Sequence, residues 1–373
     1  MLLTACGPLT PPAKDAGTGG GAATGGGAAT GGGGGITGGG GGGGGATGGG
    51  GGITGGGGGG GGTTGGGGGT QTWVFSTIGM TPAPTNSGNI VGFAETDAGI
   101  FAMSSSGRLY LSTGGAFTEQ LTFTQGQPVD FEGAPTGELF AVSTVWFSAC
   151  KSNCTDAGSW TQTRITASDE VMESLCVASG TDVLAVGSAG SGSDAKYHRY
   201  DGNTFATAST GFGGYSPNAC WRAASGNFYI PMEDGMMLYE PGTLGFTPEN
   251  TTGMPSWRGG GSALGTEWVG GYGPVIAKRE TNGTWTNVLT RSGEGSVNVI
   301  VGVSATEAFA FGGGFSSAGQ AAWKWNGTTW VELDPDLPLM NQAVSALRTS
   351  NGTIYIGGND SNLYPVIVRA RLQ

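Results

Sequence analysis

A short motif, a large apolar residue followed by Ala, Ile or Val, returns seven times along this chain. The large residues are Phe101, Phe140, Leu184, Tyr229, Trp268, Phe309 and Tyr355, at steps of 39, 44, 45, 39, 41 and 46 residues. A period of about 42 residues with strand-type composition is typical of a β-propeller with one blade per repeat. We therefore expect an all-β fold, a seven-bladed β-propeller of four-stranded blades.

Each repeat divides into four short runs with period-2 or β-branched character, which predicts four strands. The sixth repeat is the clearest, with runs at 299–303, 308–311, 321–325 and 329–333. Asn326-Gly327 joins the last two runs, and this pair suits a tight hairpin because both residues tolerate positive φ.

The outer strand of each predicted blade carries an aromatic residue near its start. These residues are Phe117, Trp160, Phe205, Phe246, Trp285 and Trp330, which makes six for seven repeats. The seventh repeat ends after three strands. The segment 71–78, with Trp73 at the aromatic position, matches the missing outer strand. We expect it to close the ring against the last blade and leave no free sheet edge.

The N-terminal part of the chain has a different composition. Of the 82 glycines, 38 lie between Gly17 and Gly69. Such a segment has almost nothing to bury, so residues 7–70 are expected to form a disordered tether with a reach of roughly 40–45 Å. The propeller would then occupy residues 71–373. The net charge is −11 and the Lys and Arg residues are scattered, which argues against a nucleic-acid partner.

Leu3-Thr4-Ala5-Cys6 resembles a bacterial lipobox, in which the Cys is lipidated. The resemblance implies that residues 1–6 are the remnant of a signal peptide and that Cys6 anchors the chain in a membrane. Only five residues precede Cys6, so we expect a start further upstream. Gly7 after the Cys resembles lipoproteins sorted to the outer membrane. The implied location is the outer membrane or cell surface of a Gram-negative bacterium.

The phrases Tyr200-Asp-Gly-Asn-Thr-Phe205 and Trp325-Asn-Gly-Thr-Thr-Trp330 resemble the repeats of secreted bacterial lipoproteins with seven-bladed propellers, similar to the Kelch and Asp-box types. The resemblance covers residues 72–373 and is specific for the fold only. The spacing around Asp156 departs from a strict Asp-box, so sialidase chemistry does not carry over.

Five cysteines fit an exported protein. With Cys6 reserved for the lipid, four remain, and they allow three pairings. We favour Cys150–Cys154, within one loop, and Cys176–Cys220, whose spacing is close to one repeat. Zinc is the alternative, but the sequence has one His and no CxxC pair, so we expect no metal and no cofactor.

Ligands of propellers usually bind on the face with the longer loops, which here join second to third strands and blade to blade. Tyr215, Trp257, Tyr272 and Phe315 lie on or near that face. Exposed aromatic side chains could bind a sugar or a protein. The alternative is that they pack between blades.

Carboxylates are few. Asp130 and Glu132 alternate on one inner strand, so both would point to one side, toward the central channel. They are weak catalytic candidates, because nothing in the sequence brings two acids to one bond. The leading hypothesis is a monomeric, lipid-anchored binding scaffold for a polysaccharide or protein partner. The alternatives are an extracellular carbohydrate-active enzyme and a purely structural envelope protein.

Overall fold

The structure is a computed structural model that describes residues 72–373 except for 167–169, 190–194, 210–216, 233–234, 243–244, 250, 252–255, 264, 292–294, 314–321 and 334–339. Cys6 and the Gly-rich segment therefore lie outside the described residues. The described chain is all-β, as expected. Its one helical element among these residues is a three-residue 3-10 turn, η1 (Ala157–Ser159).

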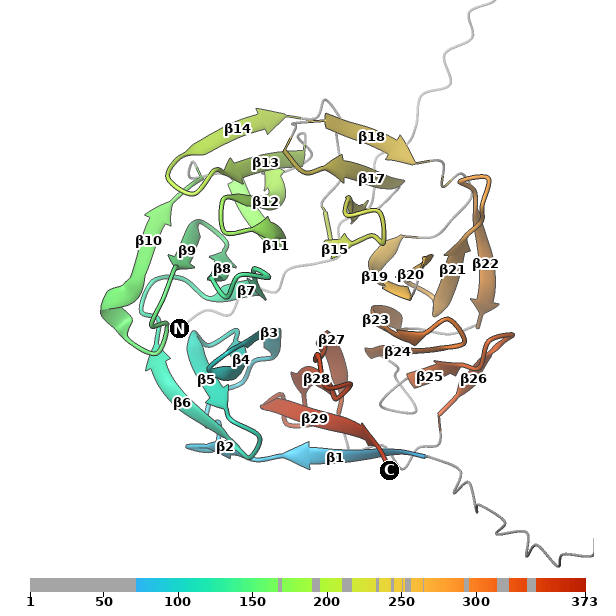
Figure 1. Cartoon of the computed structure of the whole chain (residues 1–373), viewed down its shortest axis with the longest axis horizontal. Helices are drawn as coiled ribbons and strands as arrows, with labels where there is room; N and C mark the ends of the chain where they lie inside the picture. The colour runs from blue at the N-terminus through green and yellow to red at the C-terminus, as the bar shows by residue number, and fades with distance from the viewer. Residues whose placement is uncertain are drawn as a thin grey trace, which may run out of the picture. The chain divides into compact units, whose positions relative to one another are not determined.

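Consecutive strands pair antiparallel in groups of four, numbered here along the chain (Figure 1). The first three groups are β3 (Ile90–Thr96), β4 (Gly99–Ser104), β5 (Arg108–Ser112) and β6 (Phe117–Thr122); β7 (Pro128–Gly133), β8 (Leu139–Ser143), β9 (Trp146–Cys150) and β10 (Trp160–Arg164); and β11 (Glu170–Ser179), β12 (Asp182–Ala189), β13 (Ala195–Tyr200) and β14 (Phe205–Ser209).

The next three groups follow the same order. They are β15 (Trp221–Arg222), β16 (Phe228–Met232), β17 (Gly235–Glu240) and β18 (Gly245–Glu249); β19 (Trp257–Ala263), β20 (Thr266–Gly271), β21 (Val275–Arg279) and β22 (Trp285–Thr290); and β23 (Ser296–Ser304), β24 (Glu307–Gly313), β25 (Ala322–Trp325) and β26 (Trp330–Glu332). The last group joins β27 (Gln342–Arg348), β28 (Ile354–Asn359) and β29 (Pro365–Leu372) to β1 (Trp73–Ile78).

The first strand of each group lies nearest the centre and the fourth at the periphery (Figure 1). Each first strand contacts the first strand of the next group, and β27 contacts β3. Because paired strands are antiparallel, loops between second and third strands lie on the same side as the connections between groups. We call this side the loop face. The other side, with the first-to-second and third-to-fourth turns, is the turn face.

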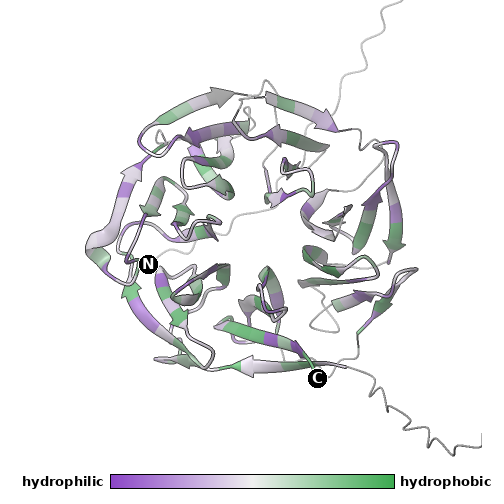
Figure 2. Cartoon of the chain, in the orientation of Figure 1, coloured by the Kyte–Doolittle hydropathy of each residue, from purple (hydrophilic) through white to green (hydrophobic). Residues whose placement is uncertain are grey.

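Buried apolar residues gather between consecutive groups, including the last and the first. Each of these clusters contains the large residue of the sequence motif on a second strand together with the aromatic residue at the start of the next group's outer strand. Examples are Tyr229 with Trp285 and Trp268 with Trp330, whose ring centroids are 5.5 and 5.3 Å apart. Short bands of apolar and polar residues alternate along the strands (Figure 2). The repeat in the sequence is therefore the repeat of this contact.

The segment around β1 joins the last group to the first. β1 pairs antiparallel with β29, from Trp73 opposite Leu372 to Ile78 opposite Ile367. Trp73 packs on Phe309 at 5.1 Å between ring centroids. The chain then continues into β2 (Met80–Thr81), which pairs parallel with β6 of the first group. The sequence predicted the pairing of β1 but not that of β2.

Glycines allow the first strands to approach each other closely at two junctions. A Cβ atom on Gly259 would lie 1.8 Å from the carbonyl oxygen of Asn298, and one on Gly261 would lie 2.1 Å from that of Ile300. Real Cβ atoms do not come so near to a backbone oxygen, so β19 can lie against β23 only without side chains there. Gly92 meets the carbonyl of Phe131 in the same way, at 2.0 Å.

Replacing Gly261 by Ala is expected to destabilise the fold by about 2–3 kcal/mol, because β19 and β23 must move apart to admit the methyl group. Urea denaturation measures the loss. Gly115→Ala is the matched control, since a Cβ there meets nothing within 4 Å. Equal stability of the two variants would show that the close approach of β19 and β23 is not required.

Candidate functional site

A cavity of about 480 Å³ lies between the first strands of the groups. The described residues that line it include four carboxylates, Glu95, Asp130, Glu132 and Glu173, and one cation, Arg222. The two weak catalytic candidates on β7 thus face the centre, as their alternation along one strand predicted. The cavity is acidic, like the chain as a whole.

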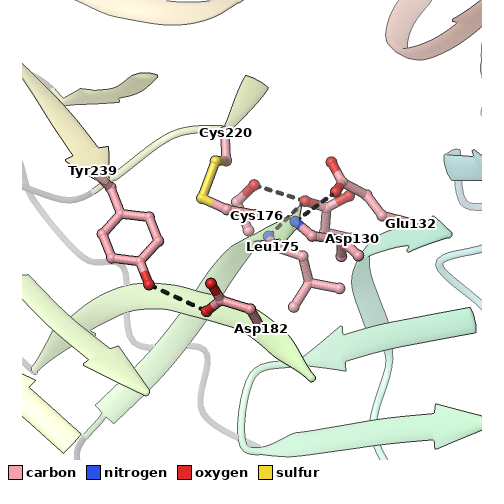
Figure 3. The surroundings of a disulfide bond; sticks show 9 residues. Asp130, Glu132, Leu175, Cys176, Asp182, Cys220 and Tyr239 are labelled. Carbon is pink, nitrogen blue, oxygen red and sulfur yellow. Dashed lines mark hydrogen bonds between the residues drawn. A yellow bond between two sulfur atoms is a disulfide. The ribbon is translucent and has the colours of Figure 1, made fainter. Parts of the chain in front are cut away.

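Asp130 joins β7 to β11. One carboxylate oxygen accepts hydrogen bonds from Ser174 Oγ at 2.6 Å and the Leu175 amide at 2.8 Å. The other oxygen accepts from the amide of Phe131 at 2.7 Å. Figure 3 shows the carboxylate beside the backbone of Leu175. The surrounding strands bury Asp130 in part, and this desolvation raises its pKa although the hydrogen bonds oppose it.

Glu132 makes a second link between the same strands. Its Oε2 accepts from the amide of Val177 at 3.2 Å. Burial raises the pKa of Glu132 well above its usual range, and the neighbouring charge of Asp130 raises it further. A hydrolytic pair needs a carboxylate free to attack or to activate water. Because both oxygens of Asp130 are occupied, the geometry favours a structural role for Asp130 over a catalytic one.

Other polar or sulfur groups at the cavity link first strands in the same way. Asn298 on β23 donates to the Ala343 carbonyl on β27 at 2.8 Å, and Ser345 on β27 donates to the Ile90 carbonyl on β3 at 2.8 Å. Cys176 on β11 forms a disulfide with Cys220, just before β15 (Figure 3). The polar lining of the cavity is therefore largely engaged in holding neighbouring groups together.

The second disulfide, Cys150–Cys154, closes the connection between β9 and β10. Both pairings are those that the sequence favoured, and they fit an exported protein. In the described part of the chain, no cluster of His, Cys, Asp and Glu side chains could hold a metal ion. Nor does any helix there have the length and apolar character to cross a membrane.

Glu173 is the carboxylate at the cavity that is least engaged. It lies near the loop-face end of β11, where Ser188 Oγ donates to its Oε1 at 3.5 Å. Its Oε2 is buried and has no hydrogen-bond partner among the described residues. Burial raises the pKa of Glu173 to about 7, against the opposing effects of Ser188 and of the positive charge of Arg258. Arg258 in turn donates to Asn218 Oδ1 at 3.2 Å.

Glu173, Asn218 and Arg258 come from the loop-face ends of three consecutive groups, and the first two line the cavity. We call this region the mouth of the cavity. No pattern in the sequence distinguishes Glu173 from the other acidic residues. The fold distinguishes Glu173 from Asp130 and Glu132, because it leaves one oxygen of Glu173 without a hydrogen-bond partner among the described residues.

Replacing Glu173 by Gln is expected to leave stability unchanged at pH 5 and to raise it by about 1 kcal/mol at pH 8. The raised pKa means that the folded state binds the proton more tightly than the unfolded state does. The stability that Glu173 contributes is therefore full below its unfolded value of 4.5 and is lost as the pH rises to about 7. Thermal melts of both proteins between pH 4.5 and 8 measure this. A constant difference across the range would contradict the raised pKa.

The four aromatic residues predicted to bind a ligand lie in different environments. Tyr215 and Phe315 lie outside the described residues. Trp257 is 0% exposed and packs in the core between two groups, so the expectation of an exposed ring there is wrong. Tyr272, in the loop between β20 and β21, is 52% exposed on the loop face. Trp257 instead packs between groups, which was the alternative expectation. It is the first residue of β19, and its side chain lies in the apolar cluster between neighbouring groups.

Sequence reasoning missed three other exposed apolar residues on the loop face. These are Val171, at the start of β11, and Leu363 and Tyr364, in the loop between β28 and β29. Single apolar residues carry little signal in a sequence, so periodicity could not have found them.

The single histidine, His198, has a structural setting. It is 3% exposed, and its Nδ1 lies 2.9 Å from Thr207 Oγ1 while its Nε2 lies 3.4 Å from Glu170 Oε2. Burial lowers its pKa, although Glu170 opposes this. It is therefore neutral near pH 7 and out of reach of a ligand in the cavity.

No protein-family model matches the chain, and no curated protein matches it in sequence. Its fold does match solved structures. Virginiamycin B lyase from Staphylococcus aureus, solved as a catalytically inactive histidine-to-alanine variant with quinupristin, aligns with a TM-score of 0.64 and 11% identity, over 81% of this chain and 100% of that one. YCF48 bound to a D1 peptide aligns with a TM-score of 0.59 and 16% identity, over 80% of this chain and 94% of that one.

The extracellular domain of BT4673 from B. thetaiotaomicron also aligns, with a TM-score of 0.59 and 13% identity, over 79% of this chain and 39% of that one. All three are β-propeller proteins. The fold of this chain is a β-propeller. At these identities the likeness extends to the fold alone, and the sequence-based prediction of that fold is confirmed.

Proposed function

We propose that this chain is an exported, lipid-anchored β-propeller that binds a polysaccharide or protein partner on its loop face, at the mouth of the central cavity. The proposed anchor is the lipidated Cys6, joined by the Gly-rich tether of residues 7–70. The location is the outer membrane or the cell surface. The propeller is a monomer of seven Kelch-like blades, each of four strands, with β1 as the closing strand. The pairing of β1 with β29 and the contact of β27 with β3 support this arrangement.

The observation that supports a binding role is which polar groups of the cavity already have hydrogen-bond partners and which do not. Asp130, Asn298 and Ser345 are occupied in links between strands. Among the residues that the structure describes, Glu173 keeps a buried oxygen without a partner at the mouth, near Arg258 and Asn218. A buried carboxylate oxygen without a partner is costly, and a ligand that donates to it removes that cost.

The neighbouring structures show that this fold serves both binding and catalysis. One of them is a lyase, and another is bound to a peptide. Because His198 is buried and Asp130 is engaged, the described residues favour binding. An extracellular carbohydrate-active enzyme remains the second candidate, supported by the carboxylates that line the cavity.

Binding of the purified full chain to arrays of bacterial envelope polysaccharides and to separated envelope proteins tests the proposal. We expect one saturable ligand whose binding is lost in Glu173→Ala or Tyr272→Ala. Turnover of a polysaccharide that disappears in an Asp130→Asn, Glu132→Gln double variant would establish the enzyme instead. Absence of any saturable ligand would leave a purely structural protein.

The anchor has its own test. Cells that express the chain behind a lipoprotein signal peptide and are fed labelled palmitate should incorporate the label into the wild type and not into Cys6→Ala. Equal labelling of the two proteins would exclude Cys6 as the lipidation site.

A further inference from the structure

Five turns among the described residues share one hydrogen-bond pattern. The amide of the first residue donates to the carbonyl of the fifth, and the amide of the fourth donates to the carbonyl of the first. The turns are Ala134–Glu138, Ala223–Asn227, Glu280–Thr284, Thr349–Thr353 and Asp360–Tyr364. They differ in where they lie. The first four are on the turn face, and Asp360–Tyr364 is on the loop face, between β28 and β29.

The fourth residue of each turn has a positive φ. In the first four turns it is glycine, at positions 137, 226, 283 and 352, with φ between 84° and 98°. In the fifth turn it is Leu363, with φ 63°. This left-handed conformation costs an ordinary side chain about 1–2 kcal/mol, and a bulky residue there is rare. The same chain thus shows that glycine fits this turn. The loop-face turn between β4 and β5 also has a glycine in the comparable place, Gly107, whose φ is 85° and whose amide donates to the Ser104 carbonyl. Position 363 has leucine instead.

Burial does not explain the leucine. Leu363 is 50% exposed and its neighbour Tyr364 is 40% exposed, so the side chains add little to the core. The turn is nevertheless held firmly. Asp360 Oδ1 accepts from the amides of Asn362 and Tyr364 at 2.8 and 2.9 Å, and the Leu363 carbonyl accepts from the Gly88 amide at 2.7 Å.

A rigid turn that holds two apolar side chains in water lowers the entropy cost of binding, because the contact residues are already ordered. Backbone strain at an exposed residue is characteristic of functional positions. We propose that Leu363 and Tyr364 form the contact point for a protein partner that offers an apolar socket. This inference rests on the proposed binding function and names the class of partner.

The chemistry of the turn favours a protein over a polysaccharide. A sugar site combines a flat aromatic ring with side chains that hydrogen-bond to hydroxyl groups. Leu363 has neither property, and Asp360 Oδ1 is occupied by the turn itself. An aliphatic and an aromatic side chain presented together suit a water-excluding pocket on a protein.

The test places a photoreactive benzophenone amino acid at Ser361 of the full chain, beside the proposed contact residues. After irradiation with the envelope fraction, the cross-linked protein is identified by mass spectrometry, purified and titrated against variants of the chain. We expect its Kd to rise about tenfold or more with Leu363→Gly and with Tyr364→Ser. Val331→Ser, which changes an equally exposed residue on β26, is the control and should bind like the wild type.

Leu363→Gly also separates binding from folding. Because glycine relieves the left-handed strain, its melting temperature should equal or exceed that of the wild type, by about 2 °C. Weak binding then cannot come from unfolding. An unchanged Kd in Leu363→Gly overturns the inference, and so does cross-linking only to polysaccharide, to lipid or to a second copy of the chain, or to nothing at all. If the array experiment finds a ligand while any of these holds, the proposed function stands and this inference alone falls.

Discussion

Removal of residues 1–79 is expected to leave a chain that does not fold. β1 supplies Trp73, Phe75 and Ile78 to the clusters on either side of the last group. Loss of three large apolar side chains amounts to roughly 5–9 kcal/mol, which is comparable to the whole stability of about 5–15 kcal/mol of a typical domain. It also uncovers β29, whose Ile367 and Val368 are at most 1% exposed, as a free sheet edge.

The matched control removes residues 2–70 and keeps β1. Its melting temperature should equal that of the full chain, because the deleted sequence offers almost nothing to bury. Circular dichroism and size-exclusion chromatography compare the two truncations. A 1–79 deletion that remains monomeric and melts with the full chain would contradict the role assigned to β1.

Loss of the Cys176–Cys220 disulfide, in a Cys176→Ala, Cys220→Ala double variant, is expected to cost about 4 kcal/mol. The bond spans 44 residues, and the loop-closure entropy of the unfolded chain rises with this length. The two first strands make few contacts at this junction, because β15 has only two residues and no strand pairing joins it to β11 among the described residues.

The equivalent double variant of Cys150 and Cys154 serves as the comparison. That bond spans 4 residues, so its loss should cost about 2 kcal/mol. Urea denaturation of the three proteins under oxidising conditions gives both values. Equal losses would show that loop length does not control the effect. Since Glu173 and Asn218 lie within three residues of Cys176 and Cys220, the first variant should also weaken any ligand bound at the cavity mouth.

The fold was predictable because its repeat is a local pattern. Phe101 and Tyr355 stand out as apolar anchors followed by small or β-branched residues, and Trp73 stands out as an outer-strand aromatic without a blade of its own. These patterns can be recognised in a single sequence because each of the residues packs in the same place, in the apolar cluster between two groups. β2 was not predictable, because a strand of two residues is too short to show the alternation of apolar and polar residues that marks a strand. Nor was the burial of Trp257, because its neighbours in sequence resemble a loop.

The site was predictable only in part, and for a physical reason. Alternation placed Asp130 and Glu132 on one side of a strand, toward the cavity. Whether a carboxylate is free or engaged depends on amide groups about 45 residues away, such as those of Leu175 and Val177. Leu363 shows the same limit, because its significance comes from a backbone angle and from comparison with four glycines elsewhere in the chain.

The position of β1 also determines how the molecule would bear mechanical load. Tension applied through the N-terminus enters the described chain at Thr72, which exchanges hydrogen bonds with Gln373 at 2.8 and 2.9 Å. Antiparallel hydrogen bonds run perpendicular to the strands. A pull along the axis of β1 therefore loads six residue pairs in shear together, instead of opening them one by one. A protein held by a tether at one end and by a partner at its loop face would resist flow through this single strand.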